Sequence, residues 1–284
     1  MELEAVIFDV DGTLADTERD GHRPAFNAAL AEVGLDWHWN DVLYGELLAI
    51  TGGKERIMAF AQLHDPDFLA RPGVEDAIRD IHARKTRHYL AQLEGGGIPL
   101  RPGIARLLAE ARQRGLRLAI ATTTTADNVI GLLRANLGPN ADGWFEVIGA
   151  GDVVASKKPA PDIYHWVLER LELGPGACLA LEDSANGLAA SLGAGIVTVV
   201  LVNEYTRNQA FSGAVAVLFD LGEAGTPCRV LAGDAGEHGL VDVDLLRRWH
   251  HLGSIPASGG CNEETVKAIY RPGRVAFACN SESA

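Results

Sequence analysis

Phe8-Asp9-Val10-Asp11-Gly12-Thr13-Leu14 carries two acidic side chains one residue apart, directly after the apolar run 5–8. The apolar run predicts a buried strand that ends at Asp9, at the edge where open parallel α/β sheets bind their ligands. A carboxylate is an effective nucleophile toward phosphorus, because the aspartyl-phosphate it forms divides one hard step into two easier ones. We therefore interpret Asp9 as a candidate nucleophile.

Asp11 completes this interpretation as the acid/base residue. It would protonate the leaving oxygen and later deprotonate the attacking water, while Gly12 lets the chain leave the strand in a tight turn. Closely spaced carboxylates such as Asp9 and Asp11 also supply the hard oxygen ligands that Mg²⁺ prefers. The alternative is an acidic turn after an edge strand, because Asp-Gly is common in turns.

Size and charge limit the class of protein. A chain of 284 residues with 47% hydrophobic content forms one large or two modest domains with a sizeable core. The formal charge of −13 and a pI near 5.1 argue against nucleic-acid and membrane-surface partners, which require a basic footprint. An anionic substrate would therefore need local positive charge and a metal ion.

The sequence shows no membrane span and no secretion signal. No apolar run approaches the roughly 20 residues that a span requires, and the acidic start 1–4 argues for a cytoplasmic protein, or for an organelle stroma if a transit peptide has been removed. The cysteines are irregularly spaced and contain no C-x-x-C pair, which argues against a zinc site. We predict free thiols at Cys178 and Cys228 and leave pairing of Cys261 with Cys279 open.

Further strands are predicted at 116–121, 177–181 and 196–202. Helical periodicity separates them, as at 104–111 and 163–171. Strands that alternate with helices imply an α/β fold with a Rossmann-like parallel sheet and right-handed crossovers. Several strand ends then meet at one edge.

One segment, 17–93, interrupts this alternation with helical periodicity and no convincing strand. Three glycines at 95–97 and a proline-rich stretch then indicate a linker. We predict a core domain from 1–16 and 97–250, with 17–93 as a helical cap domain inserted after the first strand as a lid over Asp9. The segment 251–284 loses periodicity and is predicted to be a poorly ordered extension.

Polar residues follow the other predicted strands. Thr122 ends the second strand, and its hydroxyl, with donors from Thr123 and Thr124, would bind a transferring phosphoryl group. Taken alone, Thr122 would more often be a structural residue of a strand end and helix cap, and its location at the predicted strand end favours the functional interpretation. Lys158 would direct its ammonium at the phosphoryl group. The alternative is a surface Lys-Lys pair, and Lys157 is expected to face solvent.

Glu182-Asp183 follows the third predicted strand and completes an acidic cluster. We predict a Mg²⁺ site formed by Asp9, Asp183 and the backbone carbonyl of Asp11, with Glu182 acting through a bound water. The alternative assigns Asp183 or Ser184 to the cap of a helix at 185–192, and both roles are compatible.

In this order the four segments resemble the haloacid dehalogenase superfamily of phosphotransferases. Residues 9–13 are similar to its first motif, Thr122 to its second, Lys158 to its third and Glu182-Asp183 to its fourth. The resemblance covers about residues 3–222 and implies the family's core fold with a small helical cap after the first motif. Asp11 resembles the phosphatase and phosphomutase branch, since dehalogenases lack this residue.

Segments 15–18, 21–23, 51–56, 81–86 and 157–164 are more closely similar to the CbbY-type subgroup. This resemblance implies dephosphorylation of xylulose 1,5-bisphosphate, an inhibitor of Rubisco. A phosphomutase similar to the β-phosphoglucomutases, a phosphatase of another small sugar phosphate, and a sugar-phosphate binder without turnover remain alternatives. We expect a monomer with a small-molecule substrate and neither nucleic acid nor membrane as a partner.

The predicted cap carries candidates for binding a second phosphate. Lys54 and Arg56 follow Gly52-Gly53, whose bare backbone allows an anion to approach closely, and Lys85 lies on a second cap helix. Glu18 and His22, near the hinge, are predicted to bind sugar hydroxyls.

An alternative interpretation applies to the basic residues of the second cap helix. It places them on a solvated face that includes Arg79, Arg84, Lys85 and Arg87. The cap aromatics are predicted to pack rather than to recognise substrate; they are Trp37, Trp39 and Tyr44.

Overall fold

The apolar run 5–8 forms an interior strand of a seven-stranded sheet, β1 (Ala5–Phe8), in the computed structural model, which describes residues 2–234 and 239–254. The strand order is β3-β2-β1-β4-β5-β6-β7, and all neighbours are parallel except β6 and β7. The bounds of the other strands are β2 (Arg117–Ala121), β3 (Val147–Gly149), β4 (Cys178–Glu182), β5 (Val197–Leu201), β6 (Ala216–Leu218) and β7 (Val230–Ala232).

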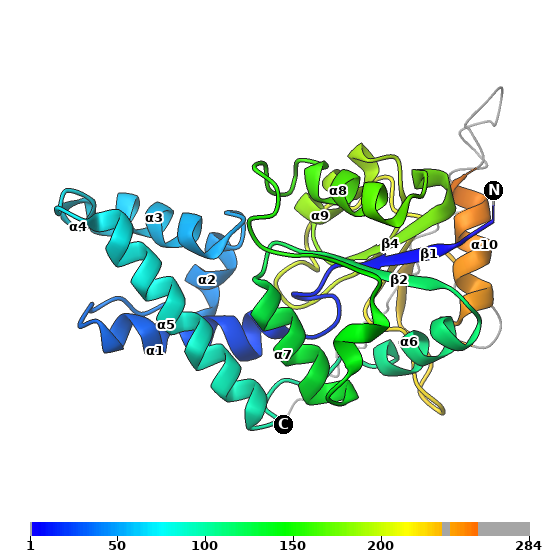
Figure 1. The fold of residues 1–284 in the computed structure, drawn as a ribbon, viewed down its shortest axis with the longest axis horizontal. Coiled ribbons are helices and arrows are strands. Elements are labelled where there is room, and N and C mark those ends of the chain that lie inside the picture. Colours follow the sequence, from blue (N-terminus) through cyan, green and yellow to red (C-terminus); the bar gives the residue numbers. More distant parts are fainter. Residues whose placement is uncertain (1, 235–238, 255–284) are drawn as a thin grey trace, which may run out of the picture.

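Helices cover both faces of this sheet. Ala5 and Ile7 pack on the face of α8 (Asp162–Leu171) and α9 (Ala185–Gly193), whereas Val6 and Phe8 pack on the opposite face. That opposite face is covered by α6 (Ile104–Gln113), α7 (Ala126–Leu137) and α10 (Val243–Gly253), and Figure 1 shows the two layers. A parallel strand covered on both faces is apolar throughout, which explains the unbroken run in β1.

The predicted α/β class and its strands are confirmed. The strands expected at 116–121, 177–181 and 196–202 are β2, β4 and β5. Strands β3, β6 and β7 were not predicted, because each spans 3 residues, too few to show a hydrophobic period.

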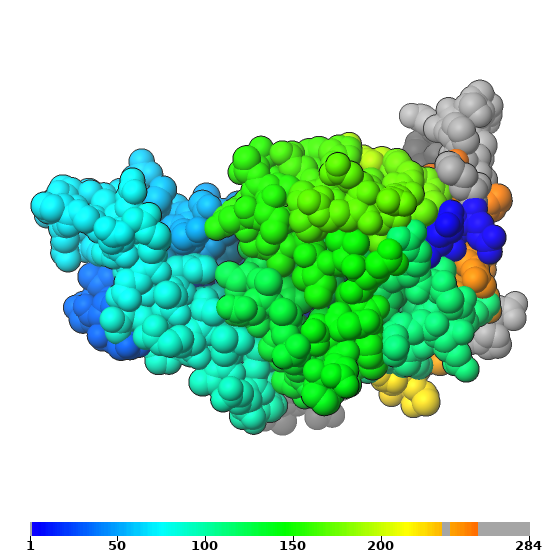
Figure 2. Space-filling view, in the orientation of Figure 1, coloured from blue at the N-terminus to red at the C-terminus, as the bar shows by residue number. Residues whose placement is uncertain are grey.

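The segment 17–93 contains helices and no strand. A π-helical turn (Glu18–His22) leads into α1 (Arg23–Glu32), followed by α2 (Asp41–Leu47), α3 (Gly53–His64), α4 (Pro66–Leu69) and α5 (Val74–Glu94). These helices enclose a separate apolar core that includes Phe26, Trp39, Tyr44, Ile57 and Phe60. The cap lies beyond the carboxyl ends of the strands (Figure 1), as a lobe beside the core (Figure 2).

The carboxyl-terminal prediction needs one correction. Helix α10 continues to Gly253, past the limit at residue 250 that the sequence suggested, because its apolar stripe, which includes Leu246 and Trp249, packs on the sheet. The rest of the predicted extension, with Cys261 and Cys279, lies outside the described residues. Cys178 and Cys228 are free thiols, as predicted. In the described ranges, no helix has the length and apolarity to cross a membrane.

The buried centre of the sheet should dominate stability. Ile7→Ala removes a side chain with 0% exposure, so we expect it to lower the free energy of unfolding by about 2–5 kcal/mol. Leu252→Ala, at a side chain with 50% exposure, should change it by less than about 0.5 kcal/mol. Urea unfolding followed by circular dichroism measures both values. Equal losses in the two variants would contradict this assignment of the core.

Candidate active site

The strand register brings the predicted motif residues together. The backbone N–H of Asp9 donates to the carbonyl of Leu181 at 3.0 Å, so the ends of β1 and β4 lie side by side. Thr122 follows β2 on the other side of β1, and its N–H donates to Gly149 at 2.9 Å. Because these strands are parallel, Asp9, Thr122 and Glu182-Asp183 reach the same edge.

Lys158 enters this edge from the loop before α8. Its Nζ donates to Asp9 Oδ1 at 2.7 Å, to Glu182 Oε1 at 2.6 Å and to the carbonyl of Ala121 at 2.8 Å. Burial alone would lower the pKa of Lys158, but the two carboxylates raise it above its ordinary value. The buried ammonium therefore stays charged beside the candidate nucleophile.

Three carboxylates form the acidic cluster. Asp9, Glu182 and Asp183 each place one oxygen within 4.8 Å of the other two, and all three are buried. Burial raises the pKa of Asp9 to about 7, against the opposing charge of Lys158. Burial and the neighbouring carboxylates likewise raise the pKa of Asp183. Such a cluster is unfavourable while its negative charges lack a compensating cation.

The cluster has the chemistry of a Mg²⁺ site. Its donors are hard carboxylate oxygens, and Glu182 Oε2 is buried without a hydrogen-bond partner in the described part of the chain. The observed residues thus fit the divalent ion that the sequence predicts. The side chain of Asp11 is not among the three clustered carboxylates, so its proposed ligand remains its backbone carbonyl.

Two residues that the sequence analysis missed orient these carboxylates. Asn203 Nδ2 donates to Asp183 Oδ2 at 2.7 Å, and the buried hydroxyl of Tyr164 donates to Glu182 Oε1. Asn203 lies just beyond β5, so the search of strand ends that found Thr122 would have found it too. Tyr164 gave no such signal, because an aromatic residue on the buried face of α8 reads as core.

Asp11 turns toward the hinge of the cap. Its Oδ1 accepts a hydrogen bond from Thr17 Oγ1 at 2.7 Å and lies 2.8 Å from His22 Nε2. Burial alone would raise the pKa of Asp11, but His22 and Thr17 lower it below its usual range. The acid/base candidate is thus held by the segment through which the chain enters the cap.

A cleft in two parts lies between core and cap. One cavity, of about 230 Å³, lies over Asp9, Lys158 and Asp183. The other, of about 200 Å³, is lined by basic and polar residues that include Lys85 and Thr124. The two cavities share Asp11, Glu18, Gly52, Arg56 and Thr123.

Lys85 is the buried cation of the second cavity. It is 4% exposed and forms no hydrogen bond or ion pair with the described residues. Its Nζ lies 5.2 Å from the ring centre of Phe26 and 5.4 Å from that of Tyr89. Burial lowers its pKa to about 8. The alternative that placed Lys85 on a solvated helix face is therefore wrong, because α5 turns this position toward the cavity.

The other basic cap residues have partners. Arg56 Nη1 contacts Tyr44 Oη at 2.9 Å, and Arg56 Nη2 lies 3.5 Å from Glu18. Tyr44 packs as predicted, but its hydroxyl also donates to Glu18 at 2.5 Å, so it contacts the site. Lys54 Nζ lies 2.6 Å from Asp152 in the core.

Lys157 corrects an expectation. It was predicted to face solvent, but its side chain is 15% exposed and its Nζ lies 2.7 Å from Glu55 and 3.1 Å from Asp152. The low exposure of Lys157 is explained by Glu55 of the cap, which contacts the loop that carries Lys157 only in the folded chain. With Lys54, these ion pairs join α3 of the cap to the loop after β3.

The remaining predicted residues also line the cleft. Gly53 and His22 belong to the second cavity, together with His82, which the sequence analysis missed. His82 lies one helical turn before Lys85 on the same helix face, and this spacing could have identified it from the sequence. Burial lowers the pKa of His82 to about 4. Thr124 accepts from Asn128 at 3.0 Å, and the cap of α7 is Thr125.

A model of haloacid dehalogenase-like hydrolases matches residues 3–195. The chain belongs to this family. This chain is 52% identical over 256 residues to the plasmid-encoded CbbY of Cupriavidus necator, and the match covers 90% of this chain and 100% of that one. The resemblance to CbbY-type proteins and the prediction of a phosphatase-type hydrolase are thereby confirmed.

Solved structures agree with this family assignment. CbbY from Rhodobacter sphaeroides in complex with phosphate is 49% identical, with a TM-score of 0.71 over 78% of this chain and 96% of that one. A point variant of the same protein in complex with xylulose 1,5-bisphosphate gives the same identity and TM-score, over 79% and 99%.

Gly12 tests the geometry of the acidic cluster in this haloacid dehalogenase-like chain. Its φ is +85°, and an added Cβ would lie 2.2 Å from Asp183 Oδ2. Gly12→Ala should therefore displace Asp183 and reduce kcat/KM for phosphoester hydrolysis at least about a hundredfold. Gly115→Ala is the control, because Gly115 has φ +77° and open space, so both variants carry the same left-handed strain of roughly 1–2 kcal/mol. Similar kinetics in the two variants would contradict the prediction.

Proposed function

We propose that this chain is a Mg²⁺-dependent sugar bisphosphate phosphatase that works through phosphorylated Asp9, with xylulose 1,5-bisphosphate as its substrate. One observation carries the proposal. The cleft places a candidate nucleophile and an acidic cluster in one cavity. In the adjoining cavity it places the buried ammonium of Lys85, which has no hydrogen bond or ion pair among the described residues. A substrate with two phosphates satisfies both cavities at once.

In the first half-reaction, a carboxylate oxygen of Asp9 attacks phosphorus and the bond from phosphorus to the sugar oxygen breaks. Asp11 must carry a proton at this step despite its lowered pKa. It donates that proton to the sugar oxygen, so the sugar leaves as an alcohol. In the second, water attacks the aspartyl-phosphate, Asp11 takes its proton, and phosphate and the free Asp9 carboxylate are released. Lys158, 2.7 Å from Asp9, stabilises the charge on the phosphoryl oxygens, and Thr122 and Thr123 supply further donors.

The chain's own ligands for Mg²⁺ would be Asp9, Asp183 and the backbone carbonyl of Asp11, with Glu182 acting through a water. When bound, the ion neutralises charge between the acidic cluster and the substrate phosphate. Glu182 is held by Lys158 and Tyr164, and Asp183 is held by Asn203. These contacts fix the carboxylates before any ligand arrives.

The second cavity, which contains Lys85, would bind the second phosphate. Lys85 forms no hydrogen bond or ion pair there with the described residues, although Asp11 and Glu18 line the same cavity, and Arg56 and Lys54 add positive charge at its walls. Gly52-Gly53 lets the backbone approach the anion. Glu18 lines both cavities and His22 lines the second one, where they would bind the sugar hydroxyls. The relative solved with xylulose 1,5-bisphosphate supports this choice of substrate.

A phosphate-release screen over sugar mono- and bisphosphates tests the function. We expect the highest kcat/KM on xylulose 1,5-bisphosphate, loss of turnover with EDTA, and recovery with Mg²⁺. Asp9→Asn should lower kcat by at least about 10⁴-fold, because the nucleophile is lost, while its circular dichroism spectrum stays that of the wild type. Inorganic phosphate equal to substrate consumed supports the phosphatase. An isomerised sugar phosphate would show a mutase, and binding without release would show a sensor.

The pKa of Lys85 gives the second anion site a pH signature. Burial depresses this pKa to about 8, so the ammonium is lost as pH rises through that value and kcat/KM for the bisphosphate should fall. Monophosphates should show a smaller fall, because they do not need Lys85. Lys85→Arg should abolish the fall, since a guanidinium stays charged. A bisphosphate profile identical in wild type and Lys85→Arg would contradict the assignment.

A further inference from the structure

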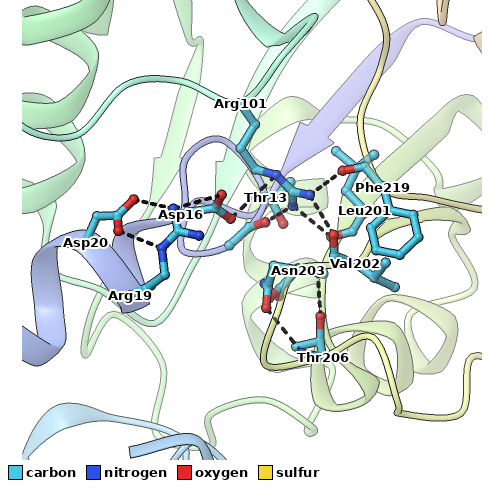
Figure 3. Close-up of polar contacts among 12 residues, drawn as sticks. Thr13, Asp16, Arg19, Asp20, Arg101, Leu201, Val202, Asn203, Thr206 and Phe219 are labelled. Carbon is cyan, nitrogen blue, oxygen red and sulfur yellow. Dashed lines mark hydrogen bonds and ion pairs between the residues drawn. The ribbon is translucent and has the colours of Figure 1, made fainter. Parts of the chain in front are cut away.

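Arg101 is a buried cation that the proposed chemistry does not use. It lies on the connection that returns from the cap to the core, and it is 7% exposed. Its Nη1 donates to the carbonyls of Gly12 and Leu201, the latter at 2.9 Å. Its Nη2 donates to Val202 at 2.6 Å and to Phe219 at 2.5 Å. Figure 3 shows the guanidinium between the turn that carries Thr13 and the ends of β5 and β6.

Backbone carbonyls accept the hydrogen bonds of this guanidinium. Asp16 adds an ion pair without a hydrogen bond, because its Oδ1 lies 3.7 Å from Arg101 Nε. Burying a cation among carbonyl dipoles is unfavourable unless all its donors are used, and burial lowers the pKa of Arg101. The planar fork of a guanidinium binds two pairs of carbonyls at once, which the single ammonium of lysine does not.

The segments joined by Arg101 flank Asp183 on two sides. Gly12 approaches Asp183 so closely that it has no room for a Cβ. Val202 precedes Asn203, whose Nδ2 donates to Asp183 Oδ2 at 2.7 Å. Asn203 is in turn fixed by Thr206, since its backbone N–H donates to the Thr206 hydroxyl at 3.0 Å (Figure 3). The guanidinium therefore sets the spacing of the two walls that hold this carboxylate.

Arg101 also stands where the two cap connections meet. Its backbone N–H donates to the carbonyl of Leu14 at 2.9 Å, and Leu100 pairs with Ala15 in an antiparallel bridge. The connections that leave and re-enter the core are thus hydrogen-bonded to each other directly beside the acidic cluster.

We propose that Arg101 is a positioning residue for the metal site: its fork of carbonyl contacts holds the Gly12 turn and the Asn203 loop so that Asp183 is preorganised for Mg²⁺. The inference rests on the proposed Mg²⁺ chemistry and adds a residue remote from the substrate. It assigns to Arg101 an effect on metal affinity and none on recognition of the sugar.

Arg106 provides a matched control. Its Nη2 donates to the carbonyls of Leu221, Gly222 and Val241 at 3.1, 3.1 and 3.0 Å. It is thus a second guanidinium that binds backbone carbonyls, on α6, and within the described part of the chain none of these carbonyl partners contacts the acidic cluster. A general loss of carbonyl contacts affects both variants, whereas a loss of metal-site geometry affects only Arg101.

The test is Mg²⁺ binding to Arg101→Gln and Arg106→Gln, measured by isothermal titration calorimetry on the full chain without substrate. We expect the Kd for Mg²⁺ to rise about 10-fold or more in Arg101→Gln, as for outer-shell partners of metal ligands, and to stay within twofold of wild type in Arg106→Gln. In kinetics, Arg101→Gln should need more Mg²⁺ for half-maximal activity. Its KM for the bisphosphate at saturating Mg²⁺ should be that of the wild type.

An unchanged Kd for Mg²⁺ in folded Arg101→Gln would overturn the inference, and so would equal increases in both variants. If Arg101→Gln does not fold, Arg101→Lys keeps the charge without the fork and should show the same weakened Mg²⁺ binding. Asn203→Ala cuts the same chain of contacts at its other end and should reproduce that result. Failure of the wild type to bind Mg²⁺ would instead reject the proposed function, so the two failures are distinguishable.

Discussion

The ammonium of Lys158, shared between Asp9 and Glu182, is the interaction on which the site depends. Asp9, Glu182 and Asp183 are buried within 4.8 Å of one another, an arrangement that their mutual repulsion and lost hydration oppose. Lys158 supplies the buried positive charge that makes it tolerable, and it is held in place by the carbonyl at the end of β2. The pKa of Asp9 is still raised, so Lys158 does not fully compensate the negative charge and the site favours binding of a further cation.

In the proposed reaction, charge is balanced in both parts of the cleft. The acidic cluster binds a divalent ion, and Lys85 and Arg56 of the cap neutralise the phosphate charge that the substrate brings. The core part of the cleft thus carries the acidic cluster together with Lys158, and the cap part carries Lys85 and Arg56 together with Glu18. The ion pairs Lys54–Asp152 and Lys157–Glu55 join α3 to the loop between β3 and α8 beside this cleft.

The hinge belongs to the same electrostatic system. Asp11 is bound by Thr17 and His22, which begin the cap, and Arg101, on the returning connection, binds the carbonyl of the residue that follows Asp11. The acid/base candidate and the metal-site walls are therefore built from the segments that carry the cap. The predicted lid would therefore be ordered together with the chemistry that we propose for the cleft.

The sequence by itself determined the class of fold, the strands that carry Asp9, Thr122 and Glu182, and the helical nature of 17–93. Those features follow from local hydrophobic period and from polar residues placed just after apolar runs. The family resemblance suggested the substrate and favoured a role for Lys85, whereas the roles of Lys54 and Arg56 were inferred from their place after Gly52-Gly53.

Only the tertiary structure decided the long-range contacts. It showed that Lys85 is buried and that Lys157 pairs with Glu55. It also showed that Tyr164 and Asn203 donate hydrogen bonds to the acidic cluster and that Arg101 binds the carbonyl of Leu201. Each of these contacts joins residues far apart in the chain, so no local pattern records them. The strength of a buried charge depends on which partners and how much water surround it. That environment exists only once the strands, the cap and both hinge connections have come together.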